Sequence, residues 1–310
     1  MPATAPAKAA FTPLRPGSWR AWLLAARVPT LSAAVAPVLV GTAAAASESG
    51  TLDGLVFAAT LAASLLIQIG TNFANDLYDF RKGADTQQRL GPVRVTQTGL
   101  LSEAEVARGT LAVFGLAVLL GAYLASVGGW PVVVIGLASV ASGVLYTAGP
   151  WPLGYHGLGD LFVFVFFGLV AVCGTYYLQA GTLTRLAVLA SVPVGLTVTN
   201  ILVVNNLRDI ETDRASGKRT LAVRIGERAT RLQYAFFAAV AYAMPLVMWM
   251  AGETGPLFWL PYLTLPVAWR LARRVMSERG PSLNAALKAT SRLHLLLAAL
   301  LSLALLGPRG

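Results

Sequence analysis

Four amide and acid side chains share one face of a segment that is otherwise apolar. They are Asn72, Asn75, Asp76 and Asp79. Their spacing of i, i+3, i+4 and i+7 would place them in a single stripe along a helix. An unpaired ionised carboxylate is costly to bury in hydrocarbon, so this stripe is expected to face a cavity filled by water or by a ligand.

A second cluster of the same form follows much later in the chain. Residues 205–209 read NNLRD and resemble residues 75–79, which read NDLYD, and each set ends an apolar run. Asn206, Asp209 and Asp213 again share one helical face, at i, i+3 and i+7. Two helices are therefore expected to deliver acids and amides to one chamber.

The residue types in these clusters favour a hard cation. Asp and Asn offer only oxygen atoms, which suits Mg²⁺, and no Cys or His accompanies them as zinc would require. Basic residues lie beside each cluster: Arg81, Lys82, Arg89 and Arg94 after the first, and Arg208, Lys218, Arg219 and Arg224 in or after the second. Acids next to Lys and Arg are the pattern expected for binding Mg²⁺ with a diphosphate.

Composition places these clusters in a membrane protein. Of the 310 residues, 56% are hydrophobic and only 12% are charged, against about 25% charged in soluble domains. The prediction is an all-α, polytopic membrane protein with a disordered tail over residues 1–18 and a single transmembrane domain over 19–310. Nine apolar runs are long enough to cross a bilayer; they cover residues 20–46, 53–75, 103–126, 130–148, 158–179, 184–207, 230–251, 256–275 and 286–306.

The distribution of positive charge predicts the orientation. The net charge is +10, and of the 24 Lys and Arg residues all except Arg185 and Arg309 fall in the tail, at the start of the first span, or in and around the loops that follow the second, sixth and eighth spans. Basic residues concentrate on the cytoplasmic side of membrane proteins. This argues against nucleic acid as a partner. It predicts a multi-pass protein of the cell (inner) membrane with a cytoplasmic N-terminus and active site and an external C-terminus.

These motifs resemble those of the UbiA-type intramembrane prenyltransferases, a family of nine-helix bundles. The resemblance rests on residues 75–79 and on Asp209 with Asp213. Within the family, the segments 82–86 (KGADT), 89–94 (RLGPVR), 205–209 and 217–220 (GKRT) are similar to those of the 1,4-dihydroxy-2-naphthoate polyprenyltransferases of menaquinone synthesis. The third acid of the first motif departs from the general pattern, because Gly83 stands at its usual place and Asp85 follows.

The resemblance implies a mechanism and roles for particular residues. Catalytic Asp76, Asp79, Asp209 and Asp213, with Asn75, would hold Mg²⁺ on the diphosphate of a polyprenyl donor. Substrate would be bound by Asn72, Asn75, Lys82, Arg89, Arg94, Tyr146, Asn206, Lys218 and Arg219. Aromatic faces such as those of Phe73, Tyr146 or Tyr155 could stabilise an allylic cation. The naphthoate ring would then attack and lose carbon dioxide, giving demethylmenaquinol.

Other functions remain open at this point. A prenyltransferase could use homogentisate or 4-hydroxybenzoate as its acceptor. A secondary transporter could bind ions on the same acids, although transporter sites lie at mid-membrane on interrupted helices. A phosphatidyl-alcohol transferase would need Asp-Gly and Ala-Arg pairs that both clusters lack. Nothing in the sequence indicates the donor chain length or the oligomeric state.

Overall fold

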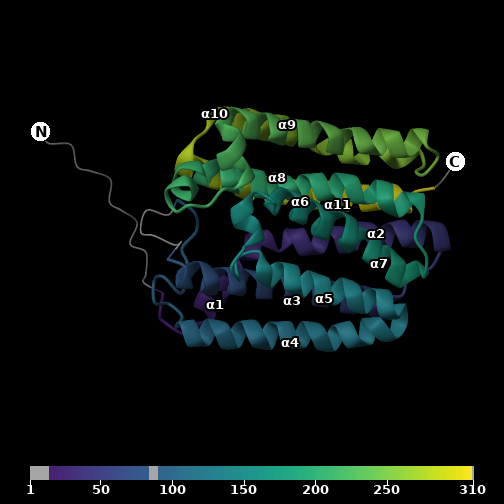
Figure 1. The fold of residues 1–310 in the computed structure, drawn as a ribbon. Coiled ribbons are helices and arrows are strands. Elements are labelled where there is room, and N and C mark those ends of the chain that lie inside the picture. The colour runs from purple at the N-terminus through teal and green to yellow at the C-terminus, as the bar shows by residue number, and fades with distance from the viewer. Residues whose placement is uncertain (1–13, 84–89, 309–310) are drawn as a thin grey trace, which may run out of the picture.

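The structure, a computed structural model, describes residues 14–83 and 90–308, and helices dominate this part of the chain (Figure 1). The first half comprises α1 (Trp19–Ala26), η1 (Val28–Thr30), α2 (Ser32–Ser49), α3 (Gly54–Arg81), α4 (Glu103–Gly128), α5 (Trp130–Leu145) and η2 (Leu153–His156). The second half comprises α6 (Gly159–Val163), η3 (Phe164–Val170), α7 (Ala171–Ala180), α8 (Arg185–Ala215), α9 (Leu221–Met250), η4 (Pro256–Thr264), α10 (Leu265–Ser277), η5 (Gly280–Ser282) and α11 (Leu283–Leu306). Most of the expected tail, Asp85 and Arg89 lie outside the described residues.

The all-helical, multi-pass prediction is confirmed, but the count of nine spans is not. Within the described residues, six helical segments are long and apolar enough to cross a membrane: α3, α4, the run from α6 to α7, α8, α9 and the run from η5 to α11. A seventh crossing is possible if Trp19–Thr30 and Ser32–Ser49, which meet at a bend of 51°, form one broken span. Pro29 lies at this bend, where its missing N–H weakens a continuous helix.

The other two expected spans differ in form. Helix α5 has only 16 residues, fewer than the roughly 20 that an upright helix needs to cross a bilayer. Residues 256–275 fold as the 3₁₀ segment η4 followed by the short α10. Hydropathy measures apolar content alone, so it could not separate these shorter forms from full-length helices.

The two helices that carry the acid clusters extend beyond the apolar spans predicted for them. Helix α3 continues to Arg81 and α8 to Ala215, because backbone hydrogen bonding proceeds after hydropathy falls. Helix α8 is central, with 67% of its most apolar stretch buried against 17% for α4, and it packs on α9, η3, α11 and α2. Both α3 and α8 end at the same end of the bundle, on the left in Figure 1.

Candidate active site

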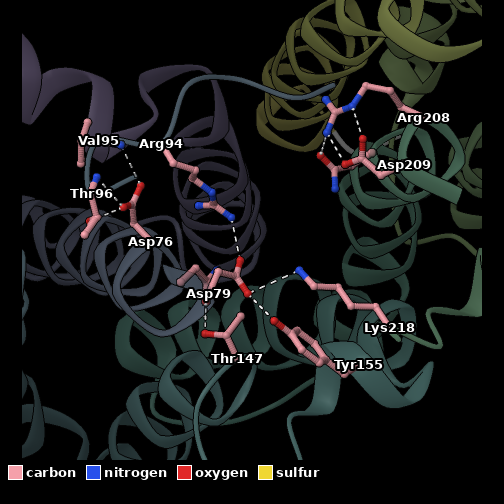
Figure 2. A network of polar contacts seen from close by, with 12 residues as sticks. Asp76, Asp79, Arg94, Val95, Thr96, Thr147, Tyr155, Arg208, Asp209 and Lys218 are labelled. Carbon is pink, nitrogen blue, oxygen red and sulfur yellow. Dashed lines mark hydrogen bonds and ion pairs between the residues drawn. The ribbon is translucent and has the colours of Figure 1, made fainter. Parts of the chain in front are cut away.

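The first cluster occupies the last turns of α3, where segments distant in sequence close around it (Figure 2). Asp76 is buried and lies under the chain that leads from α3 to α4. Its carboxylate accepts hydrogen bonds from the backbone N–H groups of Val95 (3.3 Å) and Thr96 (3.1 Å) and from the Thr96 hydroxyl. Asp76 therefore anchors this connection to the end of α3.

Asp79 connects the end of α3 to segments that come much later in the chain. Its carboxylate pairs with Arg94 at 2.8 Å and with Lys218 at 3.4 Å, and it accepts a hydrogen bond of 2.6 Å from the Tyr155 hydroxyl. Figure 2 shows Arg94 reaching Asp79 from one side and Lys218 and Tyr155 from the other. Lys218 follows the second acid cluster directly, so the expectation that both clusters serve one site is supported here by a contact.

The two amides of the first stripe contact protein neighbours. Asn72 is buried and donates to the Ala26 carbonyl (2.9 Å) and to the Thr30 hydroxyl (3.0 Å), which binds α3 to the bend after α1. Asn75 accepts from the Thr147 hydroxyl at 3.0 Å. The four stripe residues thus reach different neighbours, because a stripe on one helix turns its successive members toward different segments of the bundle.

The second cluster is held mainly by its own arginine. Arg208 donates to both carboxylate oxygens of Asp209 and also to Asn205 and Asn284. Asn284 in turn donates to the Leu90 carbonyl (2.9 Å), so α11 and the connection after α3 are tied together. Asn206 is buried. The Asp213 carbonyl accepts from the Lys218 backbone N–H at 2.9 Å, which folds the end of α8 back toward Asp79.

The acids of the two motifs offer the donor atoms that a hard cation prefers, although their side chains do not meet at one point in this structure. Within residues 14–83 and 90–308, no three Asp, Glu, His or Cys side chains gather as a metal cluster. The donors that the two motifs offer are carboxylate and amide oxygens, the ligands that Mg²⁺ prefers. A carboxylate that accepts a few hydrogen bonds still has oxygen lone pairs to share. Asn75, Asp76, Asp79, Asp209 and Asp213 therefore remain suitable donors.

The structure has two cavities of opposite character, and the first shares Tyr155 with this network. One, of about 390 Å³, is lined by Lys82, Pro150, Pro152, Tyr155, His156, Gly217, Arg219 and Arg224. The other, of about 760 Å³, is lined almost wholly by apolar side chains of α2, α3, α4, α5, η3 and α7. The first we call the basic pocket and the second the apolar groove. Ile67 lines the groove two turns of α3 before Asn75.

Two predicted residues help to shape the basic pocket. Lys82 donates from Nζ to the Gly149 carbonyl at 2.9 Å. Burial lowers the pKa of Lys82, with nearby Asp79 opposing this shift and Lys218 adding to it. Tyr146 packs under the pocket wall, because a Cβ at Gly154 or at Gly159 would lie 2.8 Å from its ring or hydroxyl.

Sequence reasoning missed the neutral partners of the acids. Thr96, Thr147 and Asn284 carry ordinary polar side chains and lie outside both motifs in the sequence. Tyr155 was expected only to present its aromatic face, whereas its hydroxyl binds Asp79. No periodicity or charge pattern marks such residues, since their roles depend on how the bundle closes.

Comparison with known proteins agrees with this geometry. Residues 34–306 match the model of the UbiA prenyltransferase family. The 1,4-dihydroxy-2-naphthoate octaprenyltransferase of Haemophilus influenzae is 36% identical over 294 residues, covering 92% of this chain and 95% of its own length. The enzyme of that name in Mycobacterium tuberculosis is 37% identical over 263 residues, covering 85% and 88%.

Solved structures show the same fold. A UbiA homologue from Aeropyrum pernix K1 superposes with a TM-score of 0.69 at 15% identity, covering 88% of this chain and 96% of its own. A UbiA homologue from Archaeoglobus fulgidus, bound to GPP and Mg²⁺, has a TM-score of 0.67 at 15% identity, covering 92% and 99%.

Proposed function

Since this chain belongs to the UbiA prenyltransferase family, we propose that it transfers a polyprenyl group from an isoprenyl diphosphate to 1,4-dihydroxy-2-naphthoate. Carbon dioxide and diphosphate leave, and the product is demethylmenaquinol, an intermediate of menaquinone biosynthesis. The observation that carries this proposal is the likeness, over most of the chain, to 1,4-dihydroxy-2-naphthoate octaprenyltransferases of several bacteria. The paired acid motifs at one end of the bundle supply the matching chemistry.

The donor diphosphate binds at the polar network around Asp79. Asn75, Asp76, Asp79, Asp209 and Asp213 are the residues that would hold Mg²⁺, which when bound neutralises the departing diphosphate. Lys82, Arg94 and Lys218 surround Asp79 and bind diphosphate oxygens as charge-assisted donors. Arg89 is predicted to act with them from outside the described residues. Asn72 and Asn206 act from buried positions that support the motif helices.

The donor chain occupies the apolar groove. Its lining by α3, α4, α5 and α7 runs away from the acid motifs into the apolar part of the bundle, so a lipid diphosphate can place its head at Asp79 and its tail among hydrocarbon side chains. Burial of each methylene contributes about 0.8 kcal/mol. The same walls exclude water that would otherwise capture the allylic cation.

Transfer then joins the two substrates. The bond between the donor's first carbon and the diphosphate oxygen breaks, and the electron pair leaves with the diphosphate. The naphthoate ring carbon that bears the carboxylate attacks the allylic cation. Loss of carbon dioxide returns an electron pair to the ring and restores its aromaticity. Tyr146 and Tyr155 lie beside the site and Phe73 lies one turn earlier on α3; all three can stabilise the cation through their faces.

We further propose nine membrane crossings in the cell (inner) membrane. The bent pair before α3, the short α5, and η4 with α10 would each cross in addition to the six long segments. The acid motifs and most basic residues would then face the cytoplasm and the end of α11 would face outward.

The test uses membranes that contain this protein, naphthoate labelled at its carboxyl carbon, a prenyl diphosphate and Mg²⁺. We expect labelled carbon dioxide and prenylated product to appear together, and only with the metal. Asp76→Asn and Asp209→Asn should abolish both signals. Transfer that survives in either variant would contradict the assignment of the motifs. Folded wild-type protein that releases no label would overturn the naphthoate acceptor, and 4-hydroxybenzoate and homogentisate would then be tested.

A further inference from the structure

The basic pocket concentrates positive charge. Lys82, Arg219 and Arg224 line it together with His156 and Tyr155, and among residues 14–83 and 90–308 no Asp or Glu lines it. Like charges that share one pocket repel one another unless an anion lies between them. The side chains of the pocket therefore favour binding of an anion.

Arg224 is held in place and still offers donors to a ligand. Its Nε donates to the Arg219 carbonyl at 3.2 Å, and its side chain lies against Gly157, where a Cβ would be 3.0 Å from that Nε. The Arg219 backbone N–H donates to the Tyr155 carbonyl at 2.9 Å. The two outer nitrogens of Arg224 have no acceptor among the described residues, so they can form a fork for a planar anion.

One wall of the pocket is a flat ring, that of His156. The His156 ring stacks on Trp151 with the ring centroids 4.2 Å apart and 23° between their planes. Its Nδ1 lies 2.9 Å from the Pro152 carbonyl; since a carbonyl oxygen only accepts, Nδ1 carries the proton of that bond. This contact fixes the plane of the imidazole. The His156 ring therefore gives the pocket one fixed flat wall, on which an aromatic ring can stack.

The pocket adjoins the donor site without containing its metal-binding acids. Tyr155 lines the pocket and also donates to Asp79 at 2.6 Å. A diphosphate with its metal requires carboxylate oxygens, which the described part of the pocket lining does not offer, whereas a carboxylate binds arginine directly. Lys82, Arg219 and Arg224 are exposed at this end of the bundle, so a soluble acid can enter here while the lipid donor enters through the apolar groove.

We propose that the basic pocket binds the carboxylate of the aromatic acceptor, with Arg219 and Arg224 as its two ligands and His156 as a wall for its ring. This inference rests on the proposed function for the identity of the acceptor, but not for its chemical class, which is an aromatic carboxylate. The acceptor ring would then lie next to Asp79 and the donor's diphosphate end. Arg224 belongs to neither acid motif.

The first test measures binding without donor or metal. Purified protein in nanodiscs is dialysed against 1-hydroxy-2-naphthoate and, separately, against 1-naphthol, which lacks the carboxylate. Wild type should bind the acid at least ~10-fold more tightly than the naphthol, as expected for a hydrogen-bonded charged group. Arg224→Gln should remove that preference and leave naphthol binding unchanged. Arg228→Gln, a change of the same charge four residues later and beyond the break in α9 at Gly226, should retain it.

The second test separates the two substrates in turnover. Arg224→Gln should raise the KM for the acceptor about tenfold or more with the donor KM unchanged, and Arg224→Lys should recover part of the loss. A rise in donor KM alone would assign the pocket to the diphosphate and overturn the proposal. Equal loss in Arg228→Gln would also overturn it, since charge alone would explain the effect.

These outcomes distinguish this inference from the proposed function. If wild type prenylates 4-hydroxybenzoate but not the naphthoate, the proposed acceptor is wrong, and a rise in the 4-hydroxybenzoate KM in Arg224→Gln still supports the pocket. If wild type prenylates the naphthoate and Arg224→Gln behaves as wild type, the pocket assignment fails alone. Wild type that shows no preference for the acid over the naphthol refutes the inference even where a variant does not fold.

Discussion

At the scale of single residues, Asp79 is the acid whose carboxylate contacts three side chains from separate segments of the chain. Its side chain is buried, as is that of Arg94, and Lys218 and Tyr155 bring in two further segments. A buried carboxylate is stable only when its charge is matched by partners. Asp79 therefore closes the site and holds Arg94 and Lys218, the two basic residues that we propose bind the donor.

Replacing Asp79 should damage stability and activity together. Asp79→Asn removes one member of a buried ion pair and leaves Arg94 without its counter-charge, which costs about 3 kcal/mol. We expect a lower melting temperature and a fall of at least ~100-fold in kcat/KM, in line with the loss of a group that assembles the site. Thermal unfolding in nanodiscs and steady-state assays measure both.

The control for this change is Asp53→Asn on the same helix. Asp53 caps α3 at its far end by accepting from Leu55 and Val56, and Asn caps helices about as well as Asp. This variant should behave as wild type. An Asp79→Asn protein with unchanged kcat/KM would contradict the role given to Asp79.

We predict that Lys82 makes donor binding sensitive to alkaline pH. Partial burial lowers the pKa of Lys82 and the neighbouring Lys218 adds to the shift, so Lys82 loses its proton at a lower pH than a fully solvated lysine does. Diphosphate binding requires the charged form. The donor KM of wild type should therefore begin to rise earlier on the alkaline side than that of Lys82→Arg, because a guanidinium stays charged.

The measurement is the donor KM from about pH 7 to about pH 10, a range that spans the titration of a perturbed lysine. Lys288→Arg, at an exposed lysine of α11, should leave the wild-type profile unchanged. Superimposable profiles for wild type and Lys82→Arg would show that Lys82 does not contact the diphosphate.

At the scale of elements, the site depends on how closely α5 approaches α3. A Cβ at Gly143 would lie 2.3 Å from the Thr71 hydroxyl oxygen, so a larger residue would force Thr71 or the helix to shift. Glycine at such close approaches is common between membrane helices. The contact lies one turn from the Asn75–Thr147 hydrogen bond. Helix spacing and the geometry of the first motif are thus coupled.

Widening this contact should disturb the site from a distance. Gly143→Ala overpacks the interface and should destabilise the fold by about 1–3 kcal/mol while lowering kcat, because Asn75 loses its partner. Gly115→Ala on α4, where nothing lies within 4 Å of the added atom, should be neutral or slightly stabilising. Thermal unfolding and kcat of both variants test this. If Gly143→Ala and Gly115→Ala had the same melting temperature and kcat, helix spacing at Gly143 would not be coupled to the geometry of the first motif.

At the scale of the whole molecule, the sequence predicted what depends on composition and period. Low charge, long apolar runs and the spacing of residues 72–79 led to a helical membrane protein with acid motifs at one end. The sequence did not predict that α5 would be short or that residues 256–277 would divide into η4 and α10, because hydropathy does not report the type or the length of a helix. It also could not predict the partners Thr96, Thr147 and Asn284, since tertiary closure alone brings them to the acids.

The orientation of the whole bundle can be tested with single cysteines. Cys173 is the one native cysteine, so Cys173→Ala gives a clean background for Thr51→Cys, Ser216→Cys, Ser282→Cys and Pro308→Cys, all at exposed positions. In intact cells an impermeant maleimide should label positions 51 and 308 only. Positions 216 and 282 should react after the membrane is opened, because basic segments stay inside.

The pair formed by positions 282 and 308 decides the number of crossings. If η4 and α10 together cross the bilayer, α9 exits, residues 256–277 return, and α11 exits again, which leaves Ser282 inside and Pro308 outside. If they remain at one surface, Ser282 becomes accessible from outside and Pro308 does not. The first pattern supports nine crossings, and the second leaves an even number with both termini in the cytoplasm. Position 216 stays inside in either case, so it serves as the internal reference for the motif-bearing end of the bundle.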